Sequence, residues 1–169
     1  MTIRREEAVR ELGRLNQQLQ VLLAQVPEGA WDVPGTIGGG DWSVRDLVGH
    51  VASWERLALE AIASAGTAGP LALPTEELDE LNAKMLEQDR TLGLPDLRQR
   101  AQDTHARLLS EIEGLDDRTW ETELLVGPGE AQKLGELVGS LTGAEDHPCG
   151  HLQAHLPDLQ AYVETVTQS

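Results

Sequence analysis

Phenylalanine is absent from this 169-residue sequence, and tyrosine and cysteine occur only once each. The apolar residues are mostly Leu, Ala and Val, a composition that suits helices better than β-sheet. The single cysteine, Cys149, excludes an intrachain disulfide and fits a reducing compartment. No apolar run approaches the roughly 18 residues needed to cross a membrane, and the start, MTIRREEAVREL, has no apolar signal-peptide core. These absences predict a cytoplasmic protein that does not enter a membrane.

Basic side chains are also scarce. The sequence has 13 Lys and Arg against 29 Asp and Glu, which gives a formal net charge of −16. Such a charge repels phosphate backbones and anionic lipids, so we expect neither nucleic acid nor a membrane as a direct partner. The length is sufficient for one domain with a full core and too short to suggest two. We therefore expect residues 1–169 to form a single domain.

Apolar residues recur at three- and four-residue steps along most of the chain, which is typical of amphipathic helices. The pattern predicts long helices over 4–26, 43–65 and 96–113, and a last helical region over 133–166 with a break at TGAEDHP. A shorter helix is expected over 75–88, where it covers an end of the core or packs on a partner chain. Four long helices with two long connections predict an all-α fold, a four-helix bundle with an additional short helix.

Local signals define the ends of these helices. The sequence SVRD predicts that Ser43 and Asp46 form a capping box at the start of the second helix. Pro148 suits the first turn of the last helix, whereas Pro157 falls inside it and removes one backbone donor. The run GTIGGGD lacks the Lys and the Ser or Thr of a phosphate-binding loop, so we interpret it as a flexible linker. We interpret the polar, glycine-rich stretch 115–132 as an irregular connection.

Three of the five histidines occur in the short stretch HPCGHLQAHLPDL. His151 and His155 are four residues apart, so on a helix both side chains lie on one face within reach of a single ion. His50 falls on the apolar stripe of the second helix and is expected to point into the bundle. Three neutral imidazoles in an interior need partners, and one divalent cation supplies a partner for all three. Spacing alone leaves two alternatives open, a metal site and hydrogen-bonded core histidines.

The other histidines and the cysteine have weaker signals. We expect His105 to be a core or boundary residue and His147 to be a cap or loop residue. Cys149 is interpreted as a packing residue first and an auxiliary thiol second. The sequence contains no GxSxG or HExxH motif, and one cysteine cannot form a CxxC pair. A bound metal ion is therefore the remaining source of chemistry.

Three carboxylates are candidates for a catalytic base or for a hydrogen-bond partner of a metal ligand. Glu55 follows His50 by little more than one helical turn, and Glu145 and Asp146 precede the histidine pair. Each of these carboxylates has an alternative interpretation as a solvated surface charge, and that is the interpretation we expect.

Two segments about a hundred residues apart, WSVRDLVGHVASWERL and GHLQAHLPDL, together resemble the DinB/YfiT-like superfamily. Within the superfamily, the WS opening, the HxxxWE step, Asn82 in ELNAKM and the HxxxHLPDL close look most like the branch named after DfsB and ClbS. The resemblance extends from the first predicted helix to the last. It implies a four-helix bundle that holds a divalent metal ion, zinc or nickel, through His50, His151 and His155, with positions left open for water or substrate.

The resemblance also implies a range of functions. Similar proteins include thiol-dependent S-transferases, a thiol-dependent isomerase and a hydrolase that disarms a genotoxin. We therefore expect a metal-dependent hydrolase or thiol S-transferase that activates water or a low-molecular-weight thiol against an electrophilic small molecule, in a stress or detoxification role. The alternative is a non-catalytic metal-binding stress protein that acts through an interaction surface. Proteins of this type are often dimeric, and exposed Leu71 and Leu73 are expected to add apolar surface to a homodimer.

Overall fold

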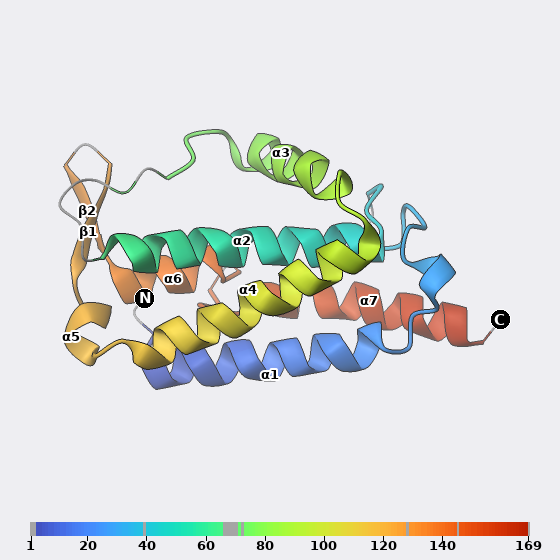
Figure 1. The fold of residues 1–169 in the computed structure, drawn as a ribbon, viewed down its shortest axis with the longest axis horizontal. Helices are drawn as coiled ribbons and strands as arrows, with labels where there is room; N and C mark the ends of the chain where they lie inside the picture. The colour runs from blue at the N-terminus through green and yellow to red at the C-terminus, as the bar shows by residue number, and fades with distance from the viewer. Residues whose placement is uncertain are drawn as a thin grey trace.

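A computed structural model describes residues 3–38, 40–65, 71, 73–127, 129–144 and 146–168. Four long helices lie side by side along the longest axis of the molecule (Figure 1). These helices are α1 (Arg5–Leu23), α2 (Val44–Ser64), α4 (Leu94–Gly114) and α7 (His151–Thr167). Helix α2 contacts α4 and α7, and α1 contacts the same two helices. The predicted four-helix bundle is confirmed.

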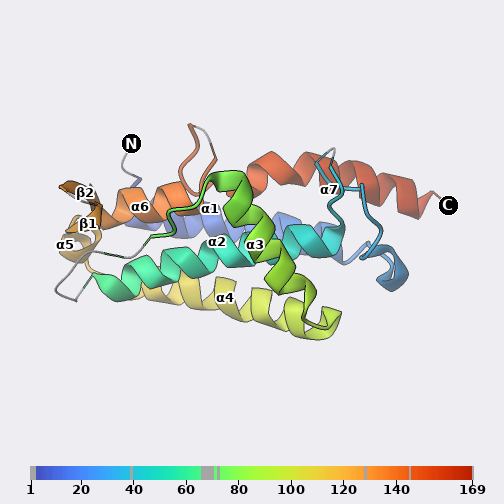
Figure 2. The ribbon, with the colours of Figure 1, turned by 90° about the horizontal axis from the view of Figure 1, so that it is seen from above.

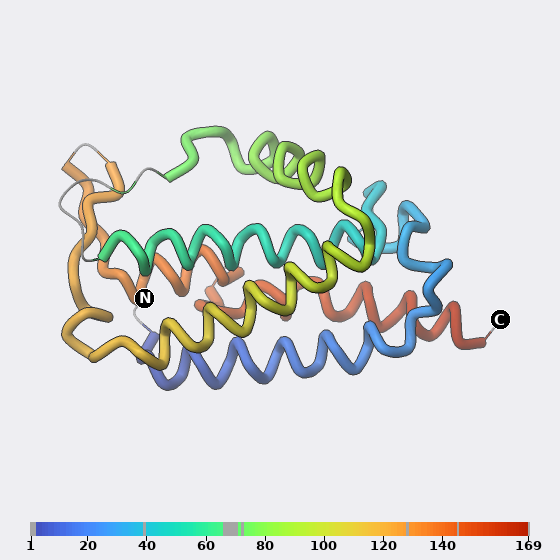
Figure 3. The backbone as a smooth tube through the Cα atoms, viewed as in Figure 1, coloured from blue at the N-terminus to red at the C-terminus, as the bar shows by residue number. Residues whose placement is uncertain are grey.

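Two shorter helices pack on α2. One is α3 (Leu78–Arg90), the predicted additional helix, which crosses α2 obliquely in the view from above (Figure 2). The other is α6 (Leu134–Leu141), which precedes α7. Figure 3 traces the break between α6 and α7. No helix in the described part of the chain is long and apolar enough to span a membrane.

The stretch 115–132, predicted to be irregular, contains regular structure. It forms a short helix, α5 (Asp117–Trp120), the strand β1 (Glu123–Gly127) and most of its antiparallel partner β2 (Glu130–Lys133). A 3₁₀ turn, η1 (Glu28–Ala30), follows α1. The prediction failed because the two strands are too short for their alternation to stand out from the surrounding polar residues.

The start of α2 is fixed by side chains, as predicted. Ser43 and Asp46 form a complete capping box. Asp46 also accepts two hydrogen bonds of 2.9 Å from Arg90, the last residue of α3. Next to this ion pair, a Cβ atom added to Gly49 would lie 2.6 Å from a carboxylate oxygen of Asp89. The missing side chain at Gly49 therefore lets α3 approach α2 closely.

The run GTIGGGD was predicted to be a flexible linker, and this prediction is wrong for its described residues. Ile37 is 1% exposed and packs in the core. The backbone N–H groups of Thr36 and Ile37 both donate to the carbonyl oxygen of Trp42, at 3.0 and 3.2 Å. The burial of Ile37, which the glycines around it concealed in the sequence, anchors the loop. Consequently Trp42 has a fixed position beside α2.

The break between α6 and α7 is longer than predicted. Helix α7 begins at His151, so Pro148 lies in the preceding turn and not in the first helical turn. Asp146 and Cys149 adopt positive φ angles of 64° and 61°, which are incompatible with a helix. The N–H of His151 donates to the carbonyl oxygen of Thr142 at 2.9 Å, so the turn is tied to the end of α6.

Two leucines that were predicted to be exposed pack against the core. Leu71 and Leu73 are half-buried against the cluster formed by α1, α2, α4 and α6. The N–H of Leu71 donates to the carbonyl oxygen of Leu125 at 2.8 Å, which holds the segment against β1. Leu78 and Leu125 are the exposed large apolar side chains near this segment, with 60% and 49% of their surfaces exposed.

Candidate metal centre

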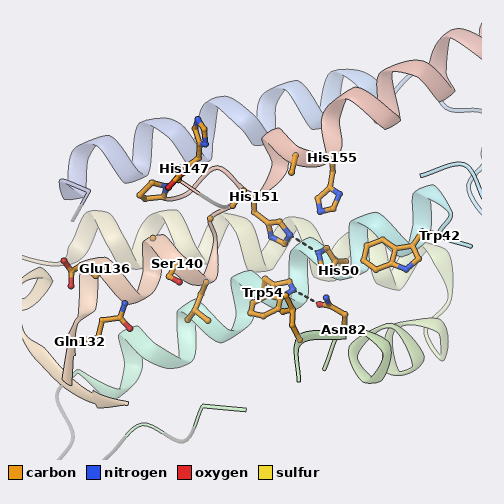
Figure 4. A pocket seen from close by; sticks show the side chains of 18 residues that line it. Trp42, His50, Trp54, Asn82, Gln132, Glu136, Ser140, His147, His151 and His155 are labelled. Carbon is orange, nitrogen blue, oxygen red and sulfur yellow. Dashed lines mark hydrogen bonds between the residues drawn. The ribbon is translucent and has the colours of Figure 1, made fainter. Parts of the chain in front are cut away.

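Three histidines from two helices meet beside the bundle core. Helix α2 carries His50, and α7 carries His151 and His155 one turn apart (Figure 4). The Nε2 atoms of His50 and His151 are 2.9 Å apart, and one ring nitrogen from each of the three residues lies within 4.8 Å of the others. His50 is 5% exposed, and the other two rings are half-buried. The structure therefore brings together the three residues that the sequence singled out.

Burial and mutual repulsion keep these rings neutral. Burial, together with repulsion from His151 and His155, lowers the pKa of His50 to about 2. Burial and repulsion from His155 lower the pKa of His151 to about 4. Burial also lowers the pKa of His155, although the charge of Asp158 opposes this shift. At neutral pH all three rings therefore present an unprotonated nitrogen, which is the form that binds a metal ion.

The spacing of the nitrogens fits a divalent ion. Two nitrogens bound to tetrahedral Zn²⁺ at about 2.0 to 2.1 Å from the ion are about 3.3 Å apart. The distances of 2.9 Å between His50 and His151 and of up to 4.8 Å within the cluster bracket this value. Imidazole nitrogen suits zinc and nickel alike. Three such ligands leave a coordination position open, as in catalytic zinc sites and unlike structural ones.

The three histidines line a pocket of about 860 Å³ bordered by α2, α3, α6 and α7. The ring of Trp42 meets His50 edge to face with centroids 4.6 Å apart, and it stacks on His155 at 6.2 Å. Trp54 lies on another side of the centre, 6.4 Å from His50 and 6.3 Å from His151. A pocket of this volume with aromatic walls is typical of small-molecule sites.

Asn82 on α3 is held in one orientation by Trp54. The Nε1 atom of Trp54 donates a hydrogen bond of 3.1 Å to Oδ1 of Asn82 (Figure 4). An indole N–H can only donate, so the amide oxygen is the atom that faces Trp54. The amide NH₂ group is then available on the pocket lining. The ion pair of Arg90 with Asp46, two turns along α3, holds this helix in place.

Glu55 was predicted to be a solvated charge, and this prediction is wrong. It is 4% exposed, and its Oε1 atom lies 2.7 Å from Nδ1 of His105 on α4. His105 is 6% exposed, which confirms it as a core residue. The prediction failed because α2 is buried over most of its circumference, so that residues beside the stripe of His50 face neighbouring helices. Glu55 is not among the residues that line the histidine pocket.

The remaining candidates lie in the turn before α7. Asp146 is exposed on the lining of the pocket, and Glu145 lies outside the described residues. His147 also lines the pocket from this turn, which confirms it as a loop residue. Cys149 is 1% exposed, and burial raises the pKa of its thiol to about 11. Cys149 is therefore a packing residue, because its thiolate is almost absent at neutral pH.

The aromatic walls of the site were not predicted from the sequence. In the sequence, Trp42, Trp54 and Asn82 stand out only as parts of the motifs that resemble the superfamily. The local signal was the position of the tryptophans. Trp42 immediately precedes the capping residue Ser43, and Trp54 lies one turn after His50, so both are near the histidine on α2.

Comparisons with solved structures identify the fold. The mycothiol-dependent maleylpyruvate isomerase aligns with a TM-score of 0.70 and 18% identity over 93% of this chain and 61% of its own. YfiT from Bacillus subtilis, described as a probable metal-dependent hydrolase with an unusual four-helix bundle topology, gives 0.67 and 17% over 96% of this chain and 87% of its own. The colibactin self-resistance protein ClbS, in complex with double-stranded DNA, gives 0.66 and 14% over 97% and 94%.

Sequence comparison identifies the family. No curated protein matches this chain. Residues 12–142, however, match the family described as the mycothiol maleylpyruvate isomerase N-terminal domain. The chain spans about three fifths of the solved isomerase, 61% of its length. The match covers most of the bundle, and together with the fold shared with YfiT and ClbS it confirms the resemblance to the DinB/YfiT-like superfamily. The chain therefore belongs to the mycothiol maleylpyruvate isomerase N-terminal domain family, within the DinB-like superfamily.

Proposed function

We propose that the chain is a metal-dependent enzyme in which His50, His151 and His155 bind one divalent ion, zinc or nickel. The observation that carries the proposal is the meeting of three unprotonated imidazoles on the wall of a pocket large enough for a small molecule. When bound, the ion would lower the pKa of a water molecule or a thiol towards neutrality. We propose hydrolysis or thiol S-transfer on an electrophilic small molecule, in a stress or detoxification role.

The chain's own residues would orient the reactants. Trp42 and Trp54 pack around the ring of His50 and limit the access of water to this ligand. The NH₂ group of Asn82, whose oxygen is occupied by Trp54, is suited to donate to a substrate oxygen that gains negative charge. These roles require no side chain other than those that line the pocket.

The polar lining of the pocket favours a neutral or cationic substrate. Glu136 and Asp146 are among the lining residues, and no Lys or Arg lines the pocket in the described part of the chain. The net charge of −16 adds to the repulsion of anions. Trp42 and Trp54 provide flat aromatic surface for an apolar or positively charged group. We therefore propose an uncharged or positively charged electrophile.

The relatives support each chemical variant of the proposal. The name of the mycothiol-dependent maleylpyruvate isomerase supports a low-molecular-weight thiol as co-substrate. The description of YfiT supports hydrolysis, with water as the nucleophile. A thiol and an electrophile need space together, and a pocket of about 860 Å³ holds two small molecules.

The competing proposal is a non-catalytic, metal-stabilised bundle that acts through its acidic surface. The ClbS structure contains double-stranded DNA, whereas the charge of −16 on this chain disfavours a nucleic-acid partner. We expect no DNA binding in a fluorescence-anisotropy titration, even at low salt. Saturable binding of a DNA duplex would contradict the expectation that this chain has no nucleic-acid partner.

Turnover tests the proposal directly. A panel of electrophiles of matched reactivity and different charge is incubated with zinc- or nickel-loaded protein, with and without cellular thiols. We expect turnover in the wild type and in His147→Ala, which changes a different histidine of the same pocket. We expect none in His155→Ala. If metal changes only the melting temperature across a broad panel, the non-catalytic proposal replaces this one.

We also propose a homodimer. Leu78 on α3 is 60% exposed and lies at the edge of the pocket, so a second copy would cover apolar surface there. Light scattering at high concentration should give twice the chain mass of 18.4 kDa. Leu78→Glu should shift the protein towards the monomer. A wild-type mass equal to one chain would contradict the proposal.

A further inference from the structure

The bundle core contains a carboxylate–imidazole pair that the proposed reaction does not use. Glu55 on α2 and His105 on α4 are 4% and 6% exposed, and Oε1 of Glu55 lies 2.7 Å from Nδ1 of His105. The Nε2 atom of His105 is buried without a hydrogen-bond partner among the described residues. A buried polar pair of this kind seldom adds stability over apolar residues of similar size. Stability alone therefore does not account for the position of this pair in the core.

A small internal cavity separates this pair from the histidine cluster. Its volume is about 10 Å³, which is close to the minimum for one water molecule. The polar residues on its wall are Glu55, Thr142, Cys149 and His151. His151 also lines the large pocket, so its side chain lies between the two spaces. The cavity thus places a buried carboxylate and one of the three clustered imidazoles around the same water-sized volume.

The orientation of His151 gives the cavity a chemical role. Its Nε2 atom faces Nε2 of His50 at 2.9 Å, on the side of the candidate metal centre. The remaining polar atom of the ring is Nδ1. A histidine that binds a metal through one nitrogen almost always donates the other N–H to a carboxylate, a carbonyl or a water molecule. Among the residues that line the cavity with His151, Glu55 is the one that carries a carboxylate.

We propose that Glu55 is a positioning residue for His151. The inference rests on the metal site of the proposed function. One water molecule in the cavity accepts the Nδ1–H of His151 and donates to the Glu55 carboxylate, while His105 holds that carboxylate from the other side. This arrangement fixes the tautomer of His151 in which Nε2 is unprotonated. It also places a buried negative charge behind the ligand of a divalent cation, where it offsets part of the charge of the ion.

Nitrogen chemical shifts of the wild-type protein test the tautomer without any substitution. In metal-free protein at pH 7 labelled with ¹⁵N-histidine, we expect His151 to be protonated at Nδ1 and unprotonated at Nε2. The short contact to His50 then requires His50 to donate its Nε2–H. A His151 ring protonated at Nε2 would overturn the proposal, whether or not a metal binds.

Metal affinity tests the function of the carboxylate. We expect Glu55→Gln, which keeps the shape and removes the charge, to weaken Zn²⁺ binding by about 10- to 100-fold in calorimetric titrations. Glu60→Gln is the matched control, because Glu60 is exposed on the same helix and pairs with Arg56. Equal Zn²⁺ affinity in wild type, Glu55→Gln and Glu60→Gln would overturn the proposal. Failure of the wild type to bind Zn²⁺ would instead overturn the proposed function. If Glu55→Gln does not fold, the nitrogen shifts of the wild type decide.

Discussion

The cluster of His50, His151 and His155 differs from the buried His105 in its partners. Around His50, one imidazole faces two others, and burial with mutual repulsion lowers the pKa of His50 to about 2. Five residues further along the same helix, Glu55 faces His105 from α4 and the two form a closed pair. The difference teaches that burial alone does not define the role of a histidine. The three clustered rings lie close enough together to share one ion, whereas Nδ1 of His105 already has a carboxylate partner.

The largest expected effect concerns metal binding by the cluster of His50, His151 and His155. We expect His151→Ala to reduce divalent metal binding by more than about 100-fold, because the loss of a ligand exceeds the 10- to 100-fold cost of losing an outer partner. Elemental analysis of purified wild type and variant, after removal of loosely bound metal, measures the effect. Equal metal content in the two proteins would show that the cluster of His50, His151 and His155 does not bind the metal.

The pair of Glu55 and His105 should have the largest effect on the free energy of unfolding. We expect His105→Leu to destabilise the metal-free protein by about 3 to 5 kcal/mol, because it leaves the Glu55 carboxylate buried and unpaired. The double variant Glu55→Leu with His105→Leu should recover most of this loss, since both partners become apolar. Urea denaturation measures the free energy of unfolding in each case. A double variant as unstable as His105→Leu would show that the pair itself stabilises the core.

Acid should reduce the stability of the folded protein through His50 and His151. The pKa values of His50 and His151 in the folded protein, about 2 and about 4, lie below the ordinary value of about 6.5. Below pH 6.5 the unfolded chain therefore binds more protons than the folded protein. The contribution of these histidines to the free energy of unfolding is fully present above pH 6.5 and declines as the pH falls towards 4. Thermal unfolding of metal-free protein at several pH values measures this decline. His151→Gln should reduce its slope, and an unchanged slope would contradict the neutral cluster.

The smallest effect is expected at the pocket wall. Trp54→Phe removes the hydrogen bond to Asn82, which should cost about 1 kcal/mol of stability without changing metal affinity. The double variant with Asn82→Leu should cost little more, because the two side chains share the same bond. Chemical denaturation and Zn²⁺ titration of the wild type, Trp54→Phe, Asn82→Leu and the double variant measure both quantities. A fall in metal affinity in Trp54→Phe would show that this tryptophan also supports metal binding by the three histidines.

The sequence predicted the parts of the site that depend on helical periodicity. The inward position of His50 and the common face of His151 and His155 follow from spacing along two helices, and the capping of Ser43 follows from a four-residue motif. Such signals are local and survive without knowledge of the fold. The break before α7 was also visible, although the positive φ angles that lengthen it were not.

The parts that escaped prediction depend on contacts between distant segments. Glu55 resembles a surface charge until His105, fifty residues away, is placed beside it. Trp42 is positioned by the burial of Ile37 in a loop whose glycines suggested flexibility. The hairpin of β1 and β2 is defined by pairing between its strands more than by the pattern within either. In each case the decisive partner is a residue that no periodic pattern connects to the first.

The separation of the clustered ligands along the chain has a consequence for folding. His50 and His151 are 101 residues apart, on helices that meet only when α7 has docked. An ion held by both would bind the folded chain and not the unfolded one, so metal concentration becomes a variable of the folding equilibrium. At a free metal concentration 100 times the dissociation constant, mass action adds about 2.7 kcal/mol to the free energy of unfolding. Metal supply in the cell would then regulate how much of the protein persists, in addition to how much of it is active.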